Sequence, residues 1–478
     1  MSDSTFYTAT TIGPIYDTTR LTSSPAGLWA ASYIFSHISY RLCGMIVDRG
    51  LVTSEYDILS PYFSKSDITI DGIGRYHDRI IFQPADPYTV LQEISKLFDD
   101  IVGEIAEVFD ETPTEWFKQY LQLHAIKFQS NGNPLCDCSQ YLDAIELERT
   151  FPAWGDNPLA DMLDSRDKDR NIKIRNKICK AFSGDKWPFP KRECLPYMED
   201  ITGRSIETER PRRKINSYYA IVQTDGDKLG KYITSIPKDE IRNFSKKCLE
   251  YCSASAELVK TYGGIPIYAG GDDLLFIAPL TGNINNAAGN ILDLLVGLRE
   301  IFEKDEFFGK DKSILTLSVG VVIRYYKYPL YEAFDEALKQ LFVVAKKKRN
   351  AAAISLQKHS GKAVEFILED FNGSEQTRRV QSLLWQSQNG EVPSSIRTKL
   401  MEYRPLFERA LTIGGNSLDN VFENIFDSDI HKNYQGILDK IQALMGSVSG
   451  NEEEKFNLLD SLLRFSKFWR EEGDDADV

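Results

Sequence analysis

Two stretches of the sequence decide the fold: residues 218–230, YYAIVQTDGDKLG, and residues 267–277, IYAGGDDLLFI. The first opens with the aromatic and β-branched residues of a buried strand, which leads into Asp225. In the second, two short apolar runs flank Gly270-Gly271-Asp272-Asp273, a pattern typical of a hairpin with a tight glycine turn. The sequence therefore predicts strands that carry acidic residues at their ends.

The segments around these stretches predict a ferredoxin-like sheet. Its elements alternate in a β-α-β-β-α-β order, and in such a sheet the strand before Asp225 lies beside the glycine-turn hairpin. Helices are expected over 237–259, about 284–302 and 330–347, and strands at 315–323 and 352–356.

Three carboxylates, those of Asp225, Asp272 and Asp273, are thus expected to converge. Such a cluster is costly without a counter-charge, and hard oxygen ligands at a sheet edge suit Mg²⁺ or Mn²⁺ that also hold substrate phosphates. Two ions can activate an attacking hydroxyl and stabilise a departing pyrophosphate. The alternative, an acidic turn on the surface, would leave Asp225 and the buried apolar flanks unexplained.

Further residues are candidates for binding a nucleotide. Gly270 and Gly271 permit the turn and allow a close approach to the backbone. The backbone N–H groups of Asp227, Lys228, Leu229 and Gly230, at the start of a helix, could bind a triphosphate. The side chain of Lys346, near the end of the helix expected over 330–347, could reach the same phosphates.

The rest of the chain divides into predicted segments. An N-terminal α/β unit is expected over 1–130, a small inserted or connecting domain with basic residues over 131–213, the acidic unit over 214–370, and a helical domain over 371–478. Other helices are expected at 28–47, 87–109, 114–128, 378–386, 395–411, 418–426, 434–445 and 452–469, and strands near 68–70 and 79–82.

Cysteines offer one further candidate site. Cys136, Cys138, Cys179 and Cys194 fall in the 131–213 segment, where zinc is conceivable, but they lack the C-x₂-C pairing of strong zinc motifs, and free cysteines are the simpler interpretation. Cys248 and Cys252 lie four residues apart on an apolar helix face and are expected in the core.

Composition limits the classes of protein. The chain has 478 residues and a net charge of −13, which argues against binding nucleic acid by bulk charge alone, although a basic face or basic partner subunits could still hold RNA. The N-terminus lacks a signal-peptide pattern, and no apolar run is long enough to span a bilayer, so a cytoplasmic protein is expected. Seven irregularly spaced cysteines agree with a reducing compartment.

Together, these motifs resemble the second palm domain in the large polymerase/cyclase subunit of type III CRISPR effector complexes, closest to the Cmr type. The resemblance rests on residues 218–230, 268–275, 317–321 with 328–330, and 345–351 with 360–362. In addition, residues 28–33, LWAASY, resemble the helix that opens the first palm domain of that family.

The resemblance implies an α+β protein with two ferredoxin-like palm domains, a degenerate first palm at 1–130 and a catalytic second palm at 214–370. It also implies a subunit that senses target RNA bound to the crRNA-guided complex and turns ATP into a signalling nucleotide. The family's metal ligands carry over to Asp225, Asp272 and Asp273, together with Gly226, and its phosphate-binding lysine to Lys346.

The resemblance implies the nucleotide product and the presence or absence of nuclease activity less directly. Cyclic oligoadenylate is the usual product, but some nuclease-lacking relatives join AMP to S-adenosylmethionine. Asp67 and Asp71 could face a cationic acceptor, although loop carboxylates at the surface are the simpler interpretation. Many members begin with an HD nuclease domain; here about two dozen residues precede residue 28, and the HD dipeptide, His77-Asp78, has few histidine companions, so HD nuclease activity is not expected.

Two alternatives remain open at the level of sequence. A free-standing diguanylate cyclase shares the palm and the glycine-acid turn, and would use GTP instead of ATP. A non-catalytic scaffold subunit would be expected to lose the acidic residues first, and all three are present.

Overall fold

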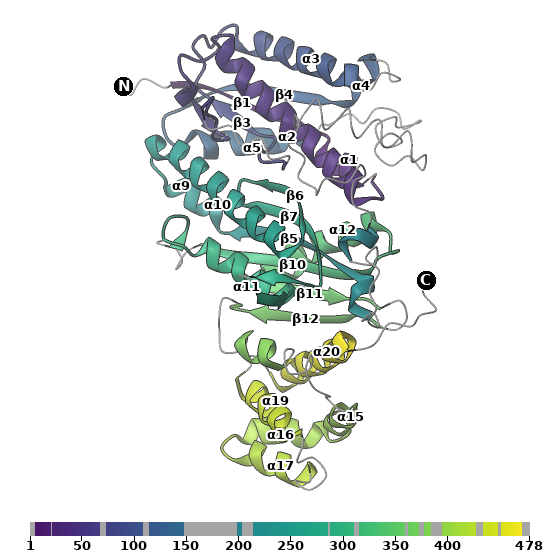
Figure 1. Ribbon diagram of the computed structural model, residues 1–478. Helices are drawn as coiled ribbons and strands as arrows, with labels where there is room; N and C mark the ends of the chain where they lie inside the picture. The colour runs from purple at the N-terminus through teal and green to yellow at the C-terminus, as the bar shows by residue number, and fades with distance from the viewer. Residues whose placement is uncertain are drawn as a thin grey trace.

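The computed structural model describes residues 5–20, 22–66, 73–108, 114–147, 198–202, 214–284, 287–309, 315–358, 362–371, 377–383, 394–426, 434–447 and 451–470. An N-terminal α+β part, a central sheet with helices and a group of C-terminal helices follow one another along the length of the molecule (Figure 1). Among the described helices, none combines the length and the apolar character needed to cross a membrane.

The N-terminal part is built on a four-stranded antiparallel sheet of order β2-β3-β1-β4, with the ferredoxin-like succession of strands and helices. Apolar residues of α2 and α3 form the core on one face, and α5 packs on the other. The elements are β1 (Thr5–Gly13), α1 (Ile15–Arg20), α2 (Pro25–Asp48), β2 (Ile58–Ser60), β3 (Ile80–Phe82), α3 (Val90–Val108), α4 (Thr114–Tyr120), β4 (Gln122–Ser130) and α5 (Pro134–Leu147).

The central sheet has the order β12-β11-β10-β5-β7-β6, and its strands β10-β5-β7-β6 repeat the order of the N-terminal sheet. β11 is parallel to β10, and the other neighbours are antiparallel. The elements are β5 (Tyr218–Asp227), α9 (Leu229–Ser235), α10 (Ile241–Tyr262), β6 (Ile265–Gly270), β7 (Asp273–Pro279), β8 (Thr281–Ile284), β9 (Ala287–Asn290), α11 (Ile291–Phe302), β10 (Thr316–Tyr325), α12 (Leu330–Lys339), α13 (Lys346–Lys348), β11 (Ala351–Leu356) and β12 (Val364–Glu369).

Strand β5 is covered on both faces, which explains its nearly continuous apolar sequence. Tyr218, Ala220 and Val222 belong to the core formed with α10 and α11. Tyr219 and Ile221, on the other face, belong to the core shared with α2 of the N-terminal part. The odd-numbered residues of β5, including Gln223 and Asp225, therefore face the N-terminal part.

The C-terminal helices are α15 (Ser394–Glu402), α16 (Arg404–Ile413), α17 (Ser417–Ile425), α19 (Gln435–Ser447) and α20 (Glu452–Arg470). α20 packs against β12. The ring of Phe468 lies 4.7 Å from that of Tyr218, and the ring of Phe465 lies 5.3 Å from that of Phe366. The helices thus extend the core of the central sheet.

Several predicted elements differ from the structure. The helix predicted over 114–128 is wrong in its second half, because β4 pairs with β1 there over nine residues. Both faces of β4 carry apolar residues, because one face packs in the core with α3 and the other packs in the core with α5. The sequence of β4 therefore lacks the alternation of apolar and polar residues that marks a half-buried strand. The helix predicted from 284 begins at Ile291, after the β8–β9 hairpin, and the helix predicted over 395–411 is divided at Tyr403.

Some predictions are not tested. The stretch at 68–70 lies outside the described residues, and the segment boundaries at 130, 213 and 370 remain predictions. The segment predicted as 131–213 begins with α5, which packs on the N-terminal sheet.

Candidate metal and nucleotide site

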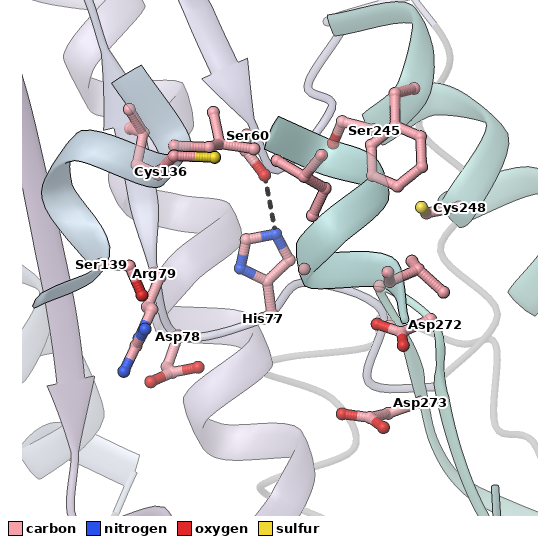
Figure 2. Close-up of a pocket in the computed structure, with 18 of the residues that line it drawn as sticks. Ser60, His77, Asp78, Arg79, Cys136, Ser139, Ser245, Cys248, Asp272 and Asp273 are labelled. Atoms are coloured by element: carbon pink, nitrogen blue, oxygen red, sulfur yellow. Dashed lines mark hydrogen bonds between the residues drawn. The ribbon is translucent and has the colours of Figure 1, made fainter. Parts of the chain in front are cut away.

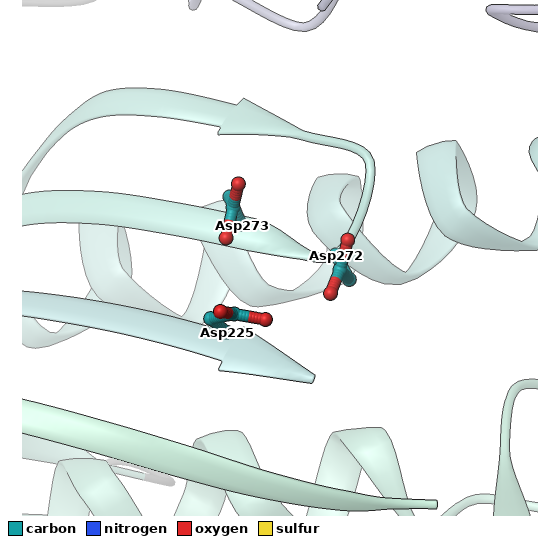
Figure 3. A group of neighbouring side chains, drawn as sticks. All are labelled: Asp225, Asp272 and Asp273. Carbon is teal, nitrogen blue, oxygen red and sulfur yellow. The ribbon is translucent and has the colours of Figure 1, made fainter. Parts of the chain in front are cut away.

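Three carboxylates meet where β5 and β6 end and β7 begins (Figure 3). Asp225 lies on β5, Asp273 begins β7, and Asp272 occupies the turn between β6 and β7. The register pairs Thr224 with Leu274, which places Asp225 beside Asp273. One oxygen from each carboxylate lies within 4.8 Å of the others, so the predicted convergence is confirmed.

Two glycines make this approach possible. Gly271 has φ +69°, in the left-handed region where a side chain is strained. Gly226 donates its backbone N–H to Asp272 Oδ2 at 3.0 Å. A Cβ on Gly226 would lie 2.9 Å from that oxygen and 2.2 Å from Leu229 Cδ1, so a larger residue would push the strand and the turn apart.

The cluster carries an electrostatic strain that a cation would relieve. Burial, and then the neighbouring Asp225, raise the pKa of Asp272 to about 7. Burial, Asp272 and Asp225 also raise the pKa of Asp273. A divalent cation would favour the ionised form of Asp272 and Asp273, and oxygen-only donors are those that Mg²⁺ and Mn²⁺ prefer. The residues therefore fit such an ion.

Lys346 supplies positive charge behind the cluster. Its Nζ lies 2.8 Å from Asp225 Oδ1 and donates to the Gly226 carbonyl oxygen at 2.7 Å. The residue follows a π-helical turn, Gln340–Ala345, which interrupts the helix begun by α12. Such bulges frequently occur at functional sites, and this one sets the direction from which Lys346 reaches β5.

The carboxylate of Asp227 is held within the fold, and the predicted contact between its backbone N–H and a nucleotide stays a prediction. Its carboxylate is buried and accepts hydrogen bonds from Thr316 Oγ1 at 2.7 Å, Ser318 Oγ at 2.8 Å and the Asn350 backbone N–H at 2.8 Å. Lys346 Nζ lies 3.4 Å from Asp227 Oδ1. The geometry gives Asp227 a role in holding β5, β10 and Lys346 together.

The other predicted nucleotide contacts lie close by. Lys228 is exposed and has φ 64°, Leu229 is buried, and Gly230 is exposed at the start of α9. Gly230, Gly270 and Gly271 line a cavity of about 640 Å³ together with Asp272 and Asp273.

This cavity is shared between the N-terminal and central parts (Figure 2). Ser60, His77 and Asp78 line it from the N-terminal part. His77 Nε2 hydrogen-bonds with Ser60 Oγ at 3.0 Å, and burial lowers the pKa of His77. The sequence offered no signal for this placement, because His77-Asp78 lies almost two hundred residues from the glycine turn.

A short segment of the N-terminal part braces the glycine turn. Gly74 pairs with Tyr268 in a parallel bridge, and the Ala269 backbone N–H donates to the Gly74 carbonyl oxygen at 2.8 Å. The backbone N–H groups of Arg75 and Tyr76 both donate to Ser36 Oγ of α2, at 2.8 Å each. The turn is therefore linked to α2 through the chain around residue 75.

The cysteine predictions have mixed outcomes. Cys248 and Cys252 are buried in the core, as predicted. Cys136 and Cys138 lie on α5 as free cysteines and line the cavity of about 640 Å³. The other residues of these predictions, Cys179 and Cys194 for zinc and Asp67 and Asp71 for an acceptor, lie outside the described residues.

Fold and site together define an α+β protein with a palm domain that presents an acidic cluster. Residues 218–354 match the family model described as Cas10/Cmr2, second palm domain. Over 172 residues the chain is 29% identical to "CRISPR system Cmr subunit Cmr2" of Pyrococcus furiosus, in a match that covers 30% of this chain and 19% of that relative.

Solved structures match over nearly the whole chain. A type III-B Cmr-beta structure in the apo state has a TM-score of 0.61 at 10% identity, covering 98% of this chain and 82% of that one. Cmr-beta bound to cognate target RNA gives 0.60 at 10% identity, covering 98% and 83%. A Csm1-Csm4 cassette in complex with cA4 gives 0.55 at 13% identity, covering 97% and 69%.

Residues 218–354 therefore form a domain of the Cas10/Cmr2 second-palm type, which confirms the resemblance seen in this part of the sequence. The match to the curated relative covers about a fifth of that protein's length.

Proposed function

We propose that the chain is a nucleotidyltransferase of a type III CRISPR complex, which joins AMP from ATP to a second substrate and releases pyrophosphate. The observation that carries this proposal is the cluster of Asp225, Asp272 and Asp273, whose oxygens lie within 4.8 Å inside the segment that matches the Cas10/Cmr2 second palm. The central sheet is then the catalytic palm. The N-terminal sheet, which repeats its strand order, is a degenerate first palm.

The three carboxylates would hold Mg²⁺ or Mn²⁺ beside Gly226. Bound there, two ions would activate the attacking hydroxyl and neutralise charge on the phosphates. Lys346 forms an ion pair with Asp225 and would add positive charge near the phosphates. Gly271 and Gly226 keep the turn and the strand close enough for one substrate to touch all three acids.

The second substrate enters from the cavity that both palms line. A second ATP would lead to cyclic oligoadenylate, and this is the product we propose; S-adenosylmethionine, which would give an AMP conjugate, is the alternative. The partners proposed for this chain are crRNA, target RNA and the other subunits of the complex. Their support is the similarity to a Cmr-beta structure bound to target RNA and to Csm1-Csm4 structures.

The test uses the double variant Asp272→Asn with Asp273→Asn in the reconstituted complex with α-labelled ATP and Mg²⁺ or Mn²⁺. Labelled product should disappear while the complex still assembles, because these side chains bind ions and do not hold the core. Asp225→Asn should act similarly, and Lys346→Ala should be milder because the three carboxylates remain.

A matched control is Asp305→Asn, which neutralises an exposed carboxylate of the same sheet unit. Product near the wild-type level from the double variant would remove the site assignment and favour a scaffold. Consumption of GTP and not ATP would favour a diguanylate cyclase.

A further inference from the structure

A second, smaller cavity of about 270 Å³ adjoins the acidic cluster. It shares Asp273, His77, Asp78 and Tyr268 with the larger cavity. Its size suits a fragment such as a heterocyclic base and is too small for a whole nucleotide triphosphate. A nucleotide whose phosphates bind at the carboxylates could therefore place its base here.

The walls of this smaller cavity come from both palms and include several aromatic side chains. α1, α2 and the chain around residue 76 contribute from the N-terminal palm, and β5, β6, β7 and α12 contribute from the central one. The aromatic residues are Tyr16, Phe35, Tyr76, Tyr268 and Phe334. Stacking on such rings holds any base, because every base has a π face, so stacking cannot by itself choose between bases.

The side-chain amide of Gln223 is a polar group that can discriminate between bases by hydrogen bonding. It lies on β5 two residues before Asp225, hence on the same face of the sheet, and it lines the smaller cavity. Its Oε1 is buried and has no hydrogen-bond partner among the described residues. Rotation of the terminal amide toward the cavity would therefore break no hydrogen bond of that oxygen. The terminal torsion angle of a glutamine side chain also has a broad, shallow energy profile.

The chemistry of an amide favours one purine. Adenine presents an N6 donor next to the N7 acceptor, which matches the carbonyl and NH₂ of a glutamine. Guanine presents two acceptors, O6 and N7, on the same edge, so one of them would face the amide oxygen. We propose that the smaller cavity binds the base of the nucleotide held at the carboxylates and that Gln223 selects adenine over guanine. This inference rests on the proposed function.

The test measures binding of α,β-methylene ATP, α,β-methylene GTP and inorganic triphosphate to the full chain with Mg²⁺ by calorimetry. The wild type should prefer the adenine analogue. Gln223→Met, which conserves volume, should reduce this preference about tenfold and leave triphosphate binding unchanged. Gln223→Asn, which withdraws the amide by one methylene, should give the same loss if the methionine variant unfolds.

The matched control is Gln381→Met, the same substitution at a part-buried glutamine whose amide donates to Asp293 Oδ1 at 2.8 Å, away from the cavity. It should keep the wild-type preference. Equal binding of both analogues by the wild type would overturn the role of Gln223, and so would a folded Gln223 variant whose preference for the adenine analogue stays within twofold of wild type. In either case, binding of triphosphate would still support the metal site. Absence of Mg²⁺-dependent binding for all three probes would overturn the proposed function and this inference with it.

Discussion

Asp272 illustrates how a buried group of carboxylates lowers the stability of the metal-free chain. Its pKa rises from 3.8 to about 7 on folding, so between these pH values the folded chain holds a proton that the unfolded chain has lost. The free energy of unfolding therefore falls as pH rises through this window and stays low above it. A bound cation would remove the penalty by compensating the charge.

We predict that Asp272→Asn raises the unfolding temperature at pH 8 in the presence of a chelator. The corresponding gain in the free energy of unfolding should be on the order of 1–2 kcal/mol, because the neutral amide avoids the buried charge. This gain should shrink toward pH 5. Thermal unfolding at both pH values checks this. Asp99→Asn, at an exposed site on α3, should show no such difference, and a variant less stable than wild type at pH 8 would contradict the electrostatic account.

Asp227 leads to the opposite expectation. Its carboxylate accepts hydrogen bonds from Thr316, Ser318 and Asn350, so Asp227→Asn brings an NH₂ group against donors. We predict a loss of about 1–3 kcal/mol in the free energy of unfolding, measured by urea titration, with Asp305→Asn as the exposed control. Unchanged stability together with lost binding of Mg²⁺-nucleotide would instead favour a direct role of the Asp227 carboxylate at the bound ion or nucleotide.

These two residues mark how far sequence reasoning reaches. The convergence of Asp225 with Asp272 and Asp273 was predictable because each acid adjoins a strand with a clear local pattern. The role of Asp227 was not, because its partners lie 89 to 123 residues away along the chain. Nothing in the stretch 218–230 indicates that one of its two acids faces ions and the other faces donors.

At the scale of elements, the acidic turn is joined by hydrogen bonds to a segment of the N-terminal part. Ser36 on α2 accepts two backbone N–H groups, from Arg75 and Tyr76, next to the bridge between Gly74 and Tyr268. Ser36→Ala would leave both N–H groups without this acceptor. We predict faster amide exchange in residues 74–77 and reduced nucleotide product, with global unfolding changed by about 1–3 kcal/mol at most.

The control for this variant is Thr412→Ala, which removes an exposed hydroxyl from the C-terminal helices. Normal exchange and normal turnover in Ser36→Ala would show that the brace does not support the turn. The brace could not be predicted from sequence, because a single parallel bridge has no periodicity to detect.

Elements whose apolar residues follow a regular helix or strand spacing were predictable from the sequence. The edge strand β4 was not. The hairpin between β6 and β7 is marked by its glycine turn. α10 is marked by apolar residues on one face. β4 has apolar residues on both faces and reads as a helix until its partner β1 is known. Strand pairing thus overrides a local pattern at the edge of the N-terminal sheet.

At the scale of the whole molecule, both cavities are lined by the N-terminal part and the central sheet unit, so a change in the relative position of these two parts would change the space around the acids. α2 contacts β6, and α1 contacts α12. A small rotation at these contacts would change both cavities together. If RNA binding elsewhere in the complex alters this interface, it would switch catalysis without touching the acidic cluster.

On the proposed function we therefore predict that labelled product forms only when the complex contains crRNA and matching target RNA, because RNA binding would set the relative position of the N-terminal and central parts. The assay supplies α-labelled ATP with Mg²⁺ or Mn²⁺, with and without S-adenosylmethionine, and identifies products by mass. Cyclic oligoadenylate should form in both mixtures, since a second ATP is the proposed acceptor. A labelled species that requires S-adenosylmethionine would replace the ring as the product, and equal turnover without target RNA would show that the interface between the palms is not the switch.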